Sequence, residues 1–184
     1  VSLSDDGLQA TFEVQAFDES MTDLVVTVMD SVTDLHGNAL VVSSSEPVTV
    51  DTVNPSTMGA PAVSDLVVSD ADGTTTLTVS FSFDEAMDQG VAPTVTFDPD
   101  VTSTLTGQTG SWTDAQTYVV EAVVADAGFD ADAVTIDITG AQDVAGNMQQ
   151  DHTATVGLEI DTVNPTTVSY SSEIITPNQA DGVV

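Results

Sequence analysis

The sequence predicts an all-β fold, specifically an antiparallel β-sandwich, and three observations support this prediction. Val, Ile and Leu alternate with Thr and Ser in several short stretches, a mixture that suits pleated strands. Turn-forming segments such as the tetrapeptide DADG separate these stretches, and no segment keeps a sustained helical period. Because 41% of the residues are hydrophobic, the chain can bury a core in spite of its high charge.

The strand candidates between residues 55 and 164 follow from alternating apolar residues and from turn signals. In chain order they are Val63–Ser69, Thr74–Phe83, Thr94–Phe97, short strands at Leu105 and Trp112 on either side of a glycine-bounded turn, Thr117–Val124, Val134–Ile138 and Thr153–Ile160. A single helical turn is expected at Asp84–Gly90. Four aromatic residues alternate with polar ones and are predicted to lie in the core, namely Phe81, Phe83, Trp112 and Tyr118.

A repeat of about 110 residues organises the chain. Three pairs of segments match: DTVNP at Asp51–Pro55 and Asp161–Pro165 (110 residues apart), DLHGN at Asp34–Asn38 and DVAGN at Asp143–Asn147 (109 apart), and VTV at Val26–Val28 and VTI at Val134–Ile136 (108 apart). Residues 1–54 are therefore predicted to be the C-terminal half of one repeat, residues 55–164 a complete repeat, and residues 165–184 the start of the next. A strand-rich unit of this length is typical of an Ig-like sandwich with Greek-key connections. We expect the chain to be a window cut from a longer tandem array.

The charge of the chain is extreme. Thirty Asp and Glu residues and no Lys or Arg give a formal net charge of −30. His36 and His152 are the only side chains that could become cationic, and both are interpreted as exposed loop histidines. Two like charges about 4 Å apart repel by roughly 4 kcal/mol at an effective dielectric constant near 20. Clustered carboxylates therefore need bulk salt, protons or bound metal cations.

The composition excludes several classes of function. Nucleic acids and anionic membrane surfaces are recognised through Lys and Arg, which the sequence lacks. The sequence has no Cys for disulfides or thiolate metal sites and no apolar stretch of about twenty residues for a transmembrane helix. No signal peptide is recognisable, so any export signal is expected outside this segment. An enzyme is not expected. Paired carboxylates can cleave glycosides, but acids that repeat at the ends of domains fit units that act as spacers better.

Acidic residues gather in the connections between the predicted strands. With strands that alternate in direction, the acids of DADG, the Asp126–Asp132 loop and Asp161 share one pole of the sandwich. The Asp84–Asp88 and Asp143–Asn147 loops share the opposite pole with the entry of the chain. A junction between consecutive units would then bring acids of both units together around DTVNP. Ca²⁺ fits such a junction best, because it accepts six to eight oxygen ligands with flexible geometry.

Three motifs together resemble a known family. FDEAMD, then DVAGN, then a strand that ends in DTVNP is similar to the bacterial Ig-like tandem repeats of giant calcium-dependent surface adhesins. The resemblance covers effectively the whole chain and implies that Ca²⁺ at the junctions stiffens the array into a rod. It names Asp51 and Asp161 as the first ligands. Further ligands implied by the resemblance are Asp70, Asp72, Asp84, Glu85 and Asp143, with oxygens also offered by Asn54 and Asn164.

The leading functional hypothesis is a non-catalytic extender segment of a secreted, extracellular adhesin or cell-surface filament. Its expected partners are neighbouring repeats of the same chain. The first alternative is a self-assembling subunit of an S-layer, sheath or extracellular fibre, with strand or edge contacts between chains. The second is a carbohydrate- or ice-binding module, for which the Thr-rich segment Thr74–Thr78 is short.

Overall fold

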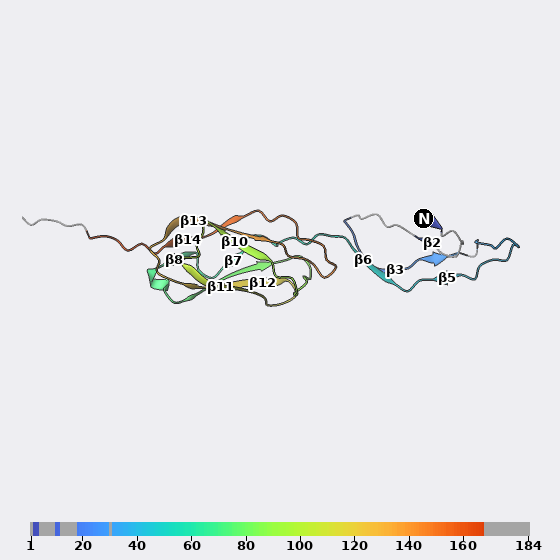
Figure 1. Ribbon diagram of the computed structural model, residues 1–184, viewed down its shortest axis with the longest axis horizontal. Coiled ribbons are helices and arrows are strands. Elements are labelled where there is room, and N and C mark those ends of the chain that lie inside the picture. Colours follow the sequence, from blue (N-terminus) through green and yellow to red (C-terminus); the bar gives the residue numbers. More distant parts are fainter. Residues whose placement is uncertain (1, 4–9, 12–17, 30, 168–184) are drawn as a thin grey trace, which may run out of the picture.

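The computed structural model describes residues 2–3, 10–11, 18–29 and 31–167. Two regions lie end to end along the long axis (Figure 1). We call residues 18–54 the amino-terminal region and residues 55–167 the sandwich region. Both consist of strands and loops, apart from one short 3₁₀ helix, so the all-β prediction is confirmed. Among the described residues, no helix has the length and apolar character needed to cross a membrane.

Two four-stranded sheets make up the sandwich region. The first has the strand order β11 (Leu105–Trp112), β12 (Thr117–Val124), β9 (Thr76–Ser82), β7 (Ala62–Val63). The second has the order β10 (Thr94–Asp98), β13 (Asp130–Thr139), β14 (Thr155–Asp161), β8 (Val67–Ser69). All neighbouring strands are antiparallel except β14 and β8, which pair in parallel.

The core lies between these two sheets. Every second residue of the central strands points inward, as the pleat of a β-strand requires. The inward residues of β9 are Leu77, Val79 and Phe81, and those facing them from β13 are Val134, Ile136 and Ile138. The predicted core aromatics belong to the same cluster: Phe81, Phe83 and Tyr118 are buried, and Trp112 packs half-buried against them. The alternation in the sequence thus predicts the core correctly.

Three local predictions differ from the structure. The segment Val63–Ser69 is not one strand: it divides into β7 and β8, which belong to opposite sheets. The glycine-bounded turn between Leu105 and Trp112 is instead the bulged strand β11, where Gly107 takes a φ of 61° at the bulge. Asp84–Gly90 contains no helical turn. Its Met87 instead forms a bridge with Asp143.

The interpretation of His152 as an exposed loop histidine is wrong. Its side chain is only 5% exposed, and its Nδ1 lies 2.8 Å from Oδ1 of Asp137. The imidazole also packs edge-on against Phe81, with ring centroids 6.0 Å apart. His152 therefore helps to close the core beside β13. His36, by contrast, lies exposed in its loop, as predicted.

Among the described residues, the amino-terminal region consists of separate pairs of strands that do not form a two-layered sandwich. Strand β3 (Ser20–Leu24) pairs with β6 (Val48–Asp51), and β4 (Thr27–Val28) pairs with β5 (Ser43–Ser44). Ahead of this region in the chain, β1 (Ser2–Leu3) pairs with β2 (Ala10–Thr11). None of the described residues from 18 to 54 is fully buried.

The strand register relates this region to the sandwich region. Leu24 lies opposite Val48 in β3–β6, and Val134 lies opposite Leu158 in β13–β14, 110 positions further along. The sequence match at a spacing of 108 aligns Val26 with Val134 instead. The two alignments differ by two residues, a shift that keeps every side chain on the same face of a strand.

Candidate metal centre

The loop Asp143–Asn147 is held in shape by its own hydrogen bonds. The Asp143 carboxylate accepts the backbone N–H of Asn147 at 2.8 Å through Oδ1 and the Asn147 side-chain N–H at 2.7 Å through Oδ2. The tight turn between them requires Gly146, whose φ of 94° is unfavourable for other residues. Asp143 is only 1% exposed, so the loop buries a carboxylate at this pole of the sandwich region.

The same loop anchors the end of the amino-terminal region. The Asn147 side-chain amide donates to the backbone carbonyl of Asp51 at 3.2 Å. Three residues after this loop, Gln150 donates its backbone N–H to the carbonyl of Pro55 at 2.8 Å and its side-chain N–H to the carbonyl of Asn54 at 3.1 Å. The linker DTVNP therefore lies along the Asp143–Asn147 loop, and Asp51 reaches the sandwich region.

Glu85 comes to this place from the connection that follows β9. The neighbouring backbone is tied to the loop, since the N–H of Val144 donates to the carbonyl of Ala86 at 3.3 Å. Partial burial raises the pKa of the Glu85 carboxyl, and the negative charges of Asp143 and Asp51 raise it further. No Lys or Arg exists in the chain to offset these charges.

These contacts produce an acidic triad of Asp51, Glu85 and Asp143. One carboxylate oxygen from each residue lies within 4.8 Å of the other two. Ligands that share one Ca²⁺ ion at 2.3–2.6 Å lie within about 5 Å of one another, so the spacing suits that cation. The donors are all hard oxygens, and Asp143 is buried and fixed by hydrogen bonds. The triad can therefore supply at least three of the six to eight oxygens that Ca²⁺ accepts.

A hollow of about 660 Å³ lies beside the triad. It is lined by residues of β6 and by the Asp143–Asn147 loop, namely Thr49, Val50, Asp51, Val144 and Ala145. At this point the two regions are joined by hydrogen bonds, beside a hollow whose lining includes the apolar residues Val50, Val144 and Ala145. Such a junction depends on its polar contacts for rigidity.

The remaining predicted ligands on this side have other partners or point elsewhere. Both carboxylate oxygens of Asp84 accept hydrogen bonds from Ser56, one from its N–H at 2.8 Å and one from its hydroxyl. Although burial opposes the change, these bonds lower the pKa of Asp84. Asn54 is exposed and offers its backbone carbonyl to Gln150. Asp84 and Asn54 therefore border the triad without being part of it.

The opposite pole collects a second, more open group of acids. The ladder of β14 with β8 places Asp161 opposite Ser69, the residue before Asp70. Burial, followed by the charges of Asp126 and Asp161, raises the pKa of Asp70. Asp72 is turned inward to its own 3₁₀ helix (Asp70–Asp72), where its Oδ2 accepts the N–H and the hydroxyl of Ser69 at 2.8 and 2.9 Å. Asn164 is exposed beyond the end of β14. The strand directions predicted this division of the acids between two poles.

Asn147 and Asp126 were not among the predicted ligands. Asn147 carries the contact to Asp51, and its position at the end of DVAGN, matched by Asn38 in DLHGN, is the signal that could have identified it. The negative charge of Asp126 contributes to the raised pKa of Asp70, after burial. No pattern in the sequence near Asp126 predicts this effect, because it depends on how the loops fold toward each other.

The two copies of each motif form the same hydrogen bonds. Asp34 accepts the backbone and side-chain N–H groups of Asn38 at 2.9 and 2.8 Å, as Asp143 does for Asn147. In the linker motif DTVNP, the backbone N–H of the valine donates to Oδ1 of the aspartate two residues before it. The distance is 3.2 Å from Val53 to Asp51 and 3.0 Å from Val163 to Asp161. The sequence match is therefore also a match in local structure.

Comparison with known proteins identified no relatives: no protein-family model, no curated protein and no solved structure matches the chain.

Proposed function

We propose that the chain is a non-catalytic extender segment of a secreted, repeat-built adhesin or cell-surface filament, stiffened by Ca²⁺ at its junctions. The observation that supports this proposal most is the composition of the acidic triad. Asp51 ends β6 of the amino-terminal region, whereas Glu85 and Asp143 belong to the sandwich region. A cation bound by all three residues connects two consecutive units and restricts bending between them.

The strand order supports an Ig-like Greek-key assignment for the sandwich region. One sheet has the order β11-β12-β9-β7 and the other β10-β13-β14-β8. Neighbours in each sheet are often not consecutive in the chain, so connections cross between the two sheets as in Greek-key sandwiches. The first segment of the region contributes to both sheets, through β7 and β8.

The duplicated hydrogen bonds support tandem repeats of about 110 residues. In this proposal residues 1–54 are the C-terminal half of one repeat, residues 55–164 a complete repeat and residues 165–184 the start of the next. The pairing of Asp51 with Ser20 and of Asp161 with Asp130 is offset by 110 positions in both strands. Consecutive units of this kind form an extended array whose partners are its own neighbouring repeats.

Ca²⁺ is the cation that the triad suits best. Mg²⁺ demands near-ideal octahedral geometry and keeps several waters, whereas Ca²⁺ tolerates irregular sets of carboxylates and carbonyls. An extracellular location at the cell surface agrees with this choice, because extracellular modules bind Ca²⁺ with dissociation constants of about 10⁻⁴–10⁻³ M. The proline of the linker, Pro55, is buried and adds further restriction to the junction.

The test is a Ca²⁺ titration followed by thermal melting and small-angle X-ray scattering. We expect Ca²⁺ to raise the melting temperature and to give a long, stiff particle that bends when a chelator is added. Glu85→Gln should weaken Ca²⁺ binding by about tenfold or more, since affinity follows the ligand charge. Glu159→Gln is the matched control, because Glu159 lies exposed on β14 away from the triad. Equal stabilisation by NaCl at matched ionic strength would contradict the proposal.

The exposed apolar surface of the amino-terminal region favours a second candidate, a self-assembling fibre or sheath subunit. Val41 is 85% exposed and Val48 52% exposed, so this face is available to strands of another chain. Sedimentation velocity over a range of concentrations distinguishes the two candidates. Polymerisation that grows with concentration supports the subunit, and a monomer at all concentrations supports the extender.

A further inference from the structure

Strand β10 forms a free edge of the second sheet. Among the described residues it pairs only with β13, and the five pairs from Thr94–Thr139 to Asp98–Thr135 follow one another without a register shift. Successive residues of an antiparallel strand direct their N–H and C=O groups alternately toward the partner strand and away from it. Beyond this ladder, the only bond from a described residue to the β10 backbone is from the Thr135 hydroxyl to the Asp98 carbonyl at 3.2 Å. The outward groups of β10 are therefore open to a further strand.

The other three sheet edges of the sandwich region are shorter or irregular. Strand β7 has two residues and β8 has three, and a bulge between Thr106 and Thr109 interrupts β11. Short strands, bulges and Lys residues are usual ways in which proteins keep a further strand from pairing with an edge. Strand β10 has none of these within its five residues, although Pro93 and Pro99 confine an added ladder to that length. It is therefore the edge of the sandwich region that is best suited to accept a strand.

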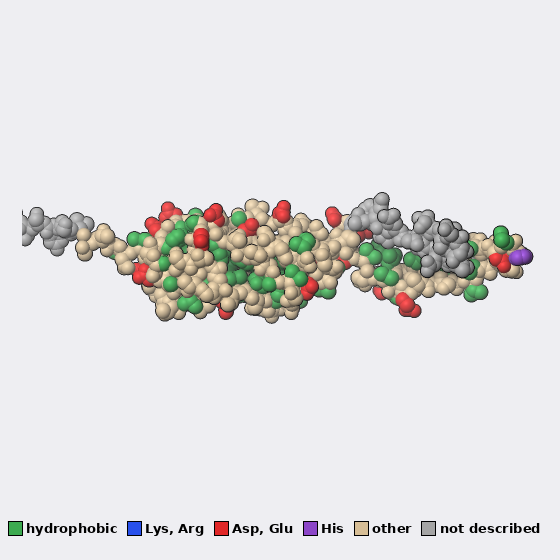
Figure 2. Space-filling model, in the orientation of Figure 1, with side chains coloured by type: hydrophobic (Ala, Val, Ile, Leu, Met, Phe, Trp, Pro, Cys, Tyr) green, Lys and Arg blue, Asp and Glu red, His purple; other side chains and the backbone are tan. Residues whose placement is uncertain are grey.

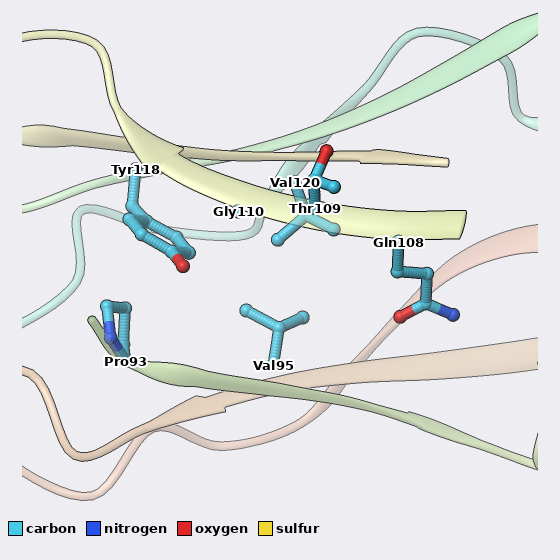
Figure 3. A pocket seen from close by; sticks show the side chains of 7 residues that line it. All are labelled: Pro93, Val95, Gln108, Thr109, Gly110, Tyr118 and Val120. Carbon is cyan, nitrogen blue, oxygen red and sulfur yellow. The ribbon is translucent and has the colours of Figure 1, made fainter. Parts of the chain in front are cut away.

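The inward side chains of β10 leave room beside them. Val95 and Phe97 are half-buried against the core, whereas the residues opposite them on β13 are buried completely. Two open hollows of about 140 and 220 Å³ adjoin this edge and share Val95 and Gln108. Figure 3 shows that the first hollow extends from Tyr118 at one end to Gln108 at the other, with Val95 between them. An elongated groove along an edge strand suits an extended peptide better than a compact ligand.

The outer face of the same edge is acidic. Thr94, Thr96 and Asp98 are exposed on it, Asp137 of β13 lies opposite Thr96 in the ladder, and Asp100 follows the end of the strand. Opposite charges at neighbouring positions of two strands stabilise their pairing, whereas like charges destabilise it. A formal net charge of −30 also repels a second copy of the chain and attracts basic partners. The strand that complements β10 is therefore basic.

We propose that β10 binds an extended, lysine-bearing segment of a partner protein, which adds a strand to the edge of the second sheet. Main-chain hydrogen bonds to β10 hold the segment, as is usual when a peptide adds to a sheet edge. Every second side chain of the segment lies beside Val95 and Phe97, and the alternate side chains include Lys near Asp98 and Asp100. The sequence contains no Lys, so a second copy of the chain cannot provide this segment. This interaction is additional to the proposed extender role and does not depend on the acidic triad.

The test measures the binding of synthetic peptides to the full chain by isothermal titration calorimetry. The probe is the blocked heptapeptide Val-Lys-Val-Thr-Val-Lys-Val, in which Val alternates with Lys and Thr. Its counterpart has Glu in place of both Lys residues. We expect the Lys peptide to bind about tenfold or more tightly than the Glu peptide at low salt, because charge complementarity steers and selects partners. The difference should shrink at about 0.5 M NaCl, since salt screens exposed charges.

Methylated forms of the Lys peptide test for the ladder itself. One form has N-methyl groups on two Val residues, and the other has them on both Lys residues. Because alternate N–H groups face opposite sides of a strand, only one of these two sets faces β10. One methylated peptide should therefore bind about tenfold or more weakly than the parent, since it lacks backbone hydrogen bonds to β10. The other should bind within about twofold of the parent, because its methyl groups face away from β10.

Two double variants test the role of the acids beside β10. Asp98→Asn combined with Asp100→Asn should weaken binding of the Lys peptide by about fivefold or more, as both carboxylates lose their charge. Asparagine retains the acceptor that Asp100 offers to the N–H of Thr102 at 2.9 Å. The matched control combines Glu121→Gln with Glu159→Gln, which removes as many charges from exposed positions on β12 and β14. It should change binding by less than about twofold, because exposed charges beyond a Debye length are largely screened.

Amide hydrogen exchange locates the bound peptide. Exchange should slow in Thr94–Asp98 and stay unchanged in Val67–Ser69, the edge strand β8 at the other side of the same sheet. Protection of β8 in place of β10 would overturn the inference, as would equal binding of the Lys and Glu peptides. An equal response to both methylations would contradict a ladder on one side of the peptide. Absence of saturable binding by the Lys peptide would remove the site altogether.

Discussion

The amino-terminal region and the second half of the sandwich region share motifs, strand register and hydrogen bonds, but their apolar side chains have different surroundings. Leu158 is 3% exposed, whereas Val48, at the equivalent position 110 residues earlier, is 52% exposed. Figure 2 shows the fuller body of the sandwich region beside the slender described part of the amino-terminal region. In the sandwich region, Leu158 belongs to the core that lies between the two sheets. Local hydrogen bonds are thus sufficient to form the motifs, whereas a second sheet is needed to bury the apolar side chains of the strands.

The largest expected difference between the two regions concerns these apolar positions. Leu158→Ala should reduce the free energy of unfolding by about 2–5 kcal/mol, as is usual for a buried leucine. Val48→Ala should change it by no more than about 0.5 kcal/mol, because the side chain is half in water already. Urea denaturation followed by Trp112 fluorescence measures both values. A large loss for Val48→Ala would mean that this face is covered in solution.

The two aspartates of the DLHGN and DVAGN loops should differ by a smaller amount. Asp143→Ala leaves the N–H groups of Asn147 without their buried acceptor and should cost about 1–3 kcal/mol. Asp34→Ala leaves the equivalent groups of Asn38 to be hydrogen-bonded by water, so the loss should be clearly smaller than for Asp143→Ala. Urea denaturation at high salt, which screens the repulsion between acids, measures both variants. Equal costs would show that burial of the loop contributes nothing.

The glycines of the same loops give a comparison in which only backbone strain changes. Gly146 and Gly37 have φ values of 94° and 85°, and a Cβ atom would meet nothing within 4 Å at either position. Alanine should therefore cost about 1 kcal/mol through strain alone. We expect Gly146→Ala to lower the melting temperature of the sandwich region and Gly37→Ala to leave it unchanged. A drop in both variants would indicate that the regions unfold together.

The smallest expected effect is a difference in pH dependence. Hydrogen bonds from the Ser69 backbone and side chain lower the pKa of Asp72, and those from Asn38 lower the pKa of Asp34. A lowered pKa contributes stability above the ordinary value of 3.8, and this stability is lost as the pH falls through the folded-state pKa. Asp72→Asn should therefore flatten the acid limb of stability against pH for the sandwich region.

The control for this measurement is Asp34→Asn, which should leave the acid limb unchanged because Asp34 lies in the amino-terminal region. At low pH, protonation of the other acids relieves their mutual repulsion equally in the unsubstituted protein and in both variants. Only differences between the three curves of stability against pH are therefore compared. Unfolding free energies between pH 6 and pH 3 supply these curves. If Asp34→Asn flattened the limb as much as Asp72→Asn, the two regions would be thermodynamically coupled.

The sequence predicts the regular parts of the fold and misses those that depend on distant contacts. Strand β12 has the bounds Thr117–Val124 in both the prediction and the structure, because its alternation is uninterrupted. The sequence predicts two short strands in place of β11 because glycines usually mark turns, whereas Gly107 here forms a bulge inside one strand. The sequence does not predict the burial of His152, because nothing near it in the chain reveals its partner Asp137.

The same contrast between local sequence patterns and distant contacts applies to the candidate site. Asp51, Glu85 and Asp143 each belong to a motif that the sequence analysis singled out, so all three were among the predicted ligands. Their meeting depends on the hydrogen bonds that seat the linker on the Asp143–Asn147 loop, and these join residues 96 positions apart. The predicted ligands that do not join the triad, such as Asp72 and Asp84, accept hydrogen bonds from nearby serines instead. Short motifs thus identify candidate ligands, and the tertiary contacts select among them.

The parallel pairing of β8 with β14 has a mechanical consequence. The chain enters the sandwich region at one end and leaves it at the other, beyond β14 (Figure 1). Tension along the long axis therefore pulls β8 and β14 in opposite directions along their common length. Their ladder pairs Glu159 with Val67, Ile160 with Val68 and Asp161 with Ser69. Such shear would load all of these hydrogen bonds at once, whereas peeling would break them one after another, so we expect this short pair to resist pulling force.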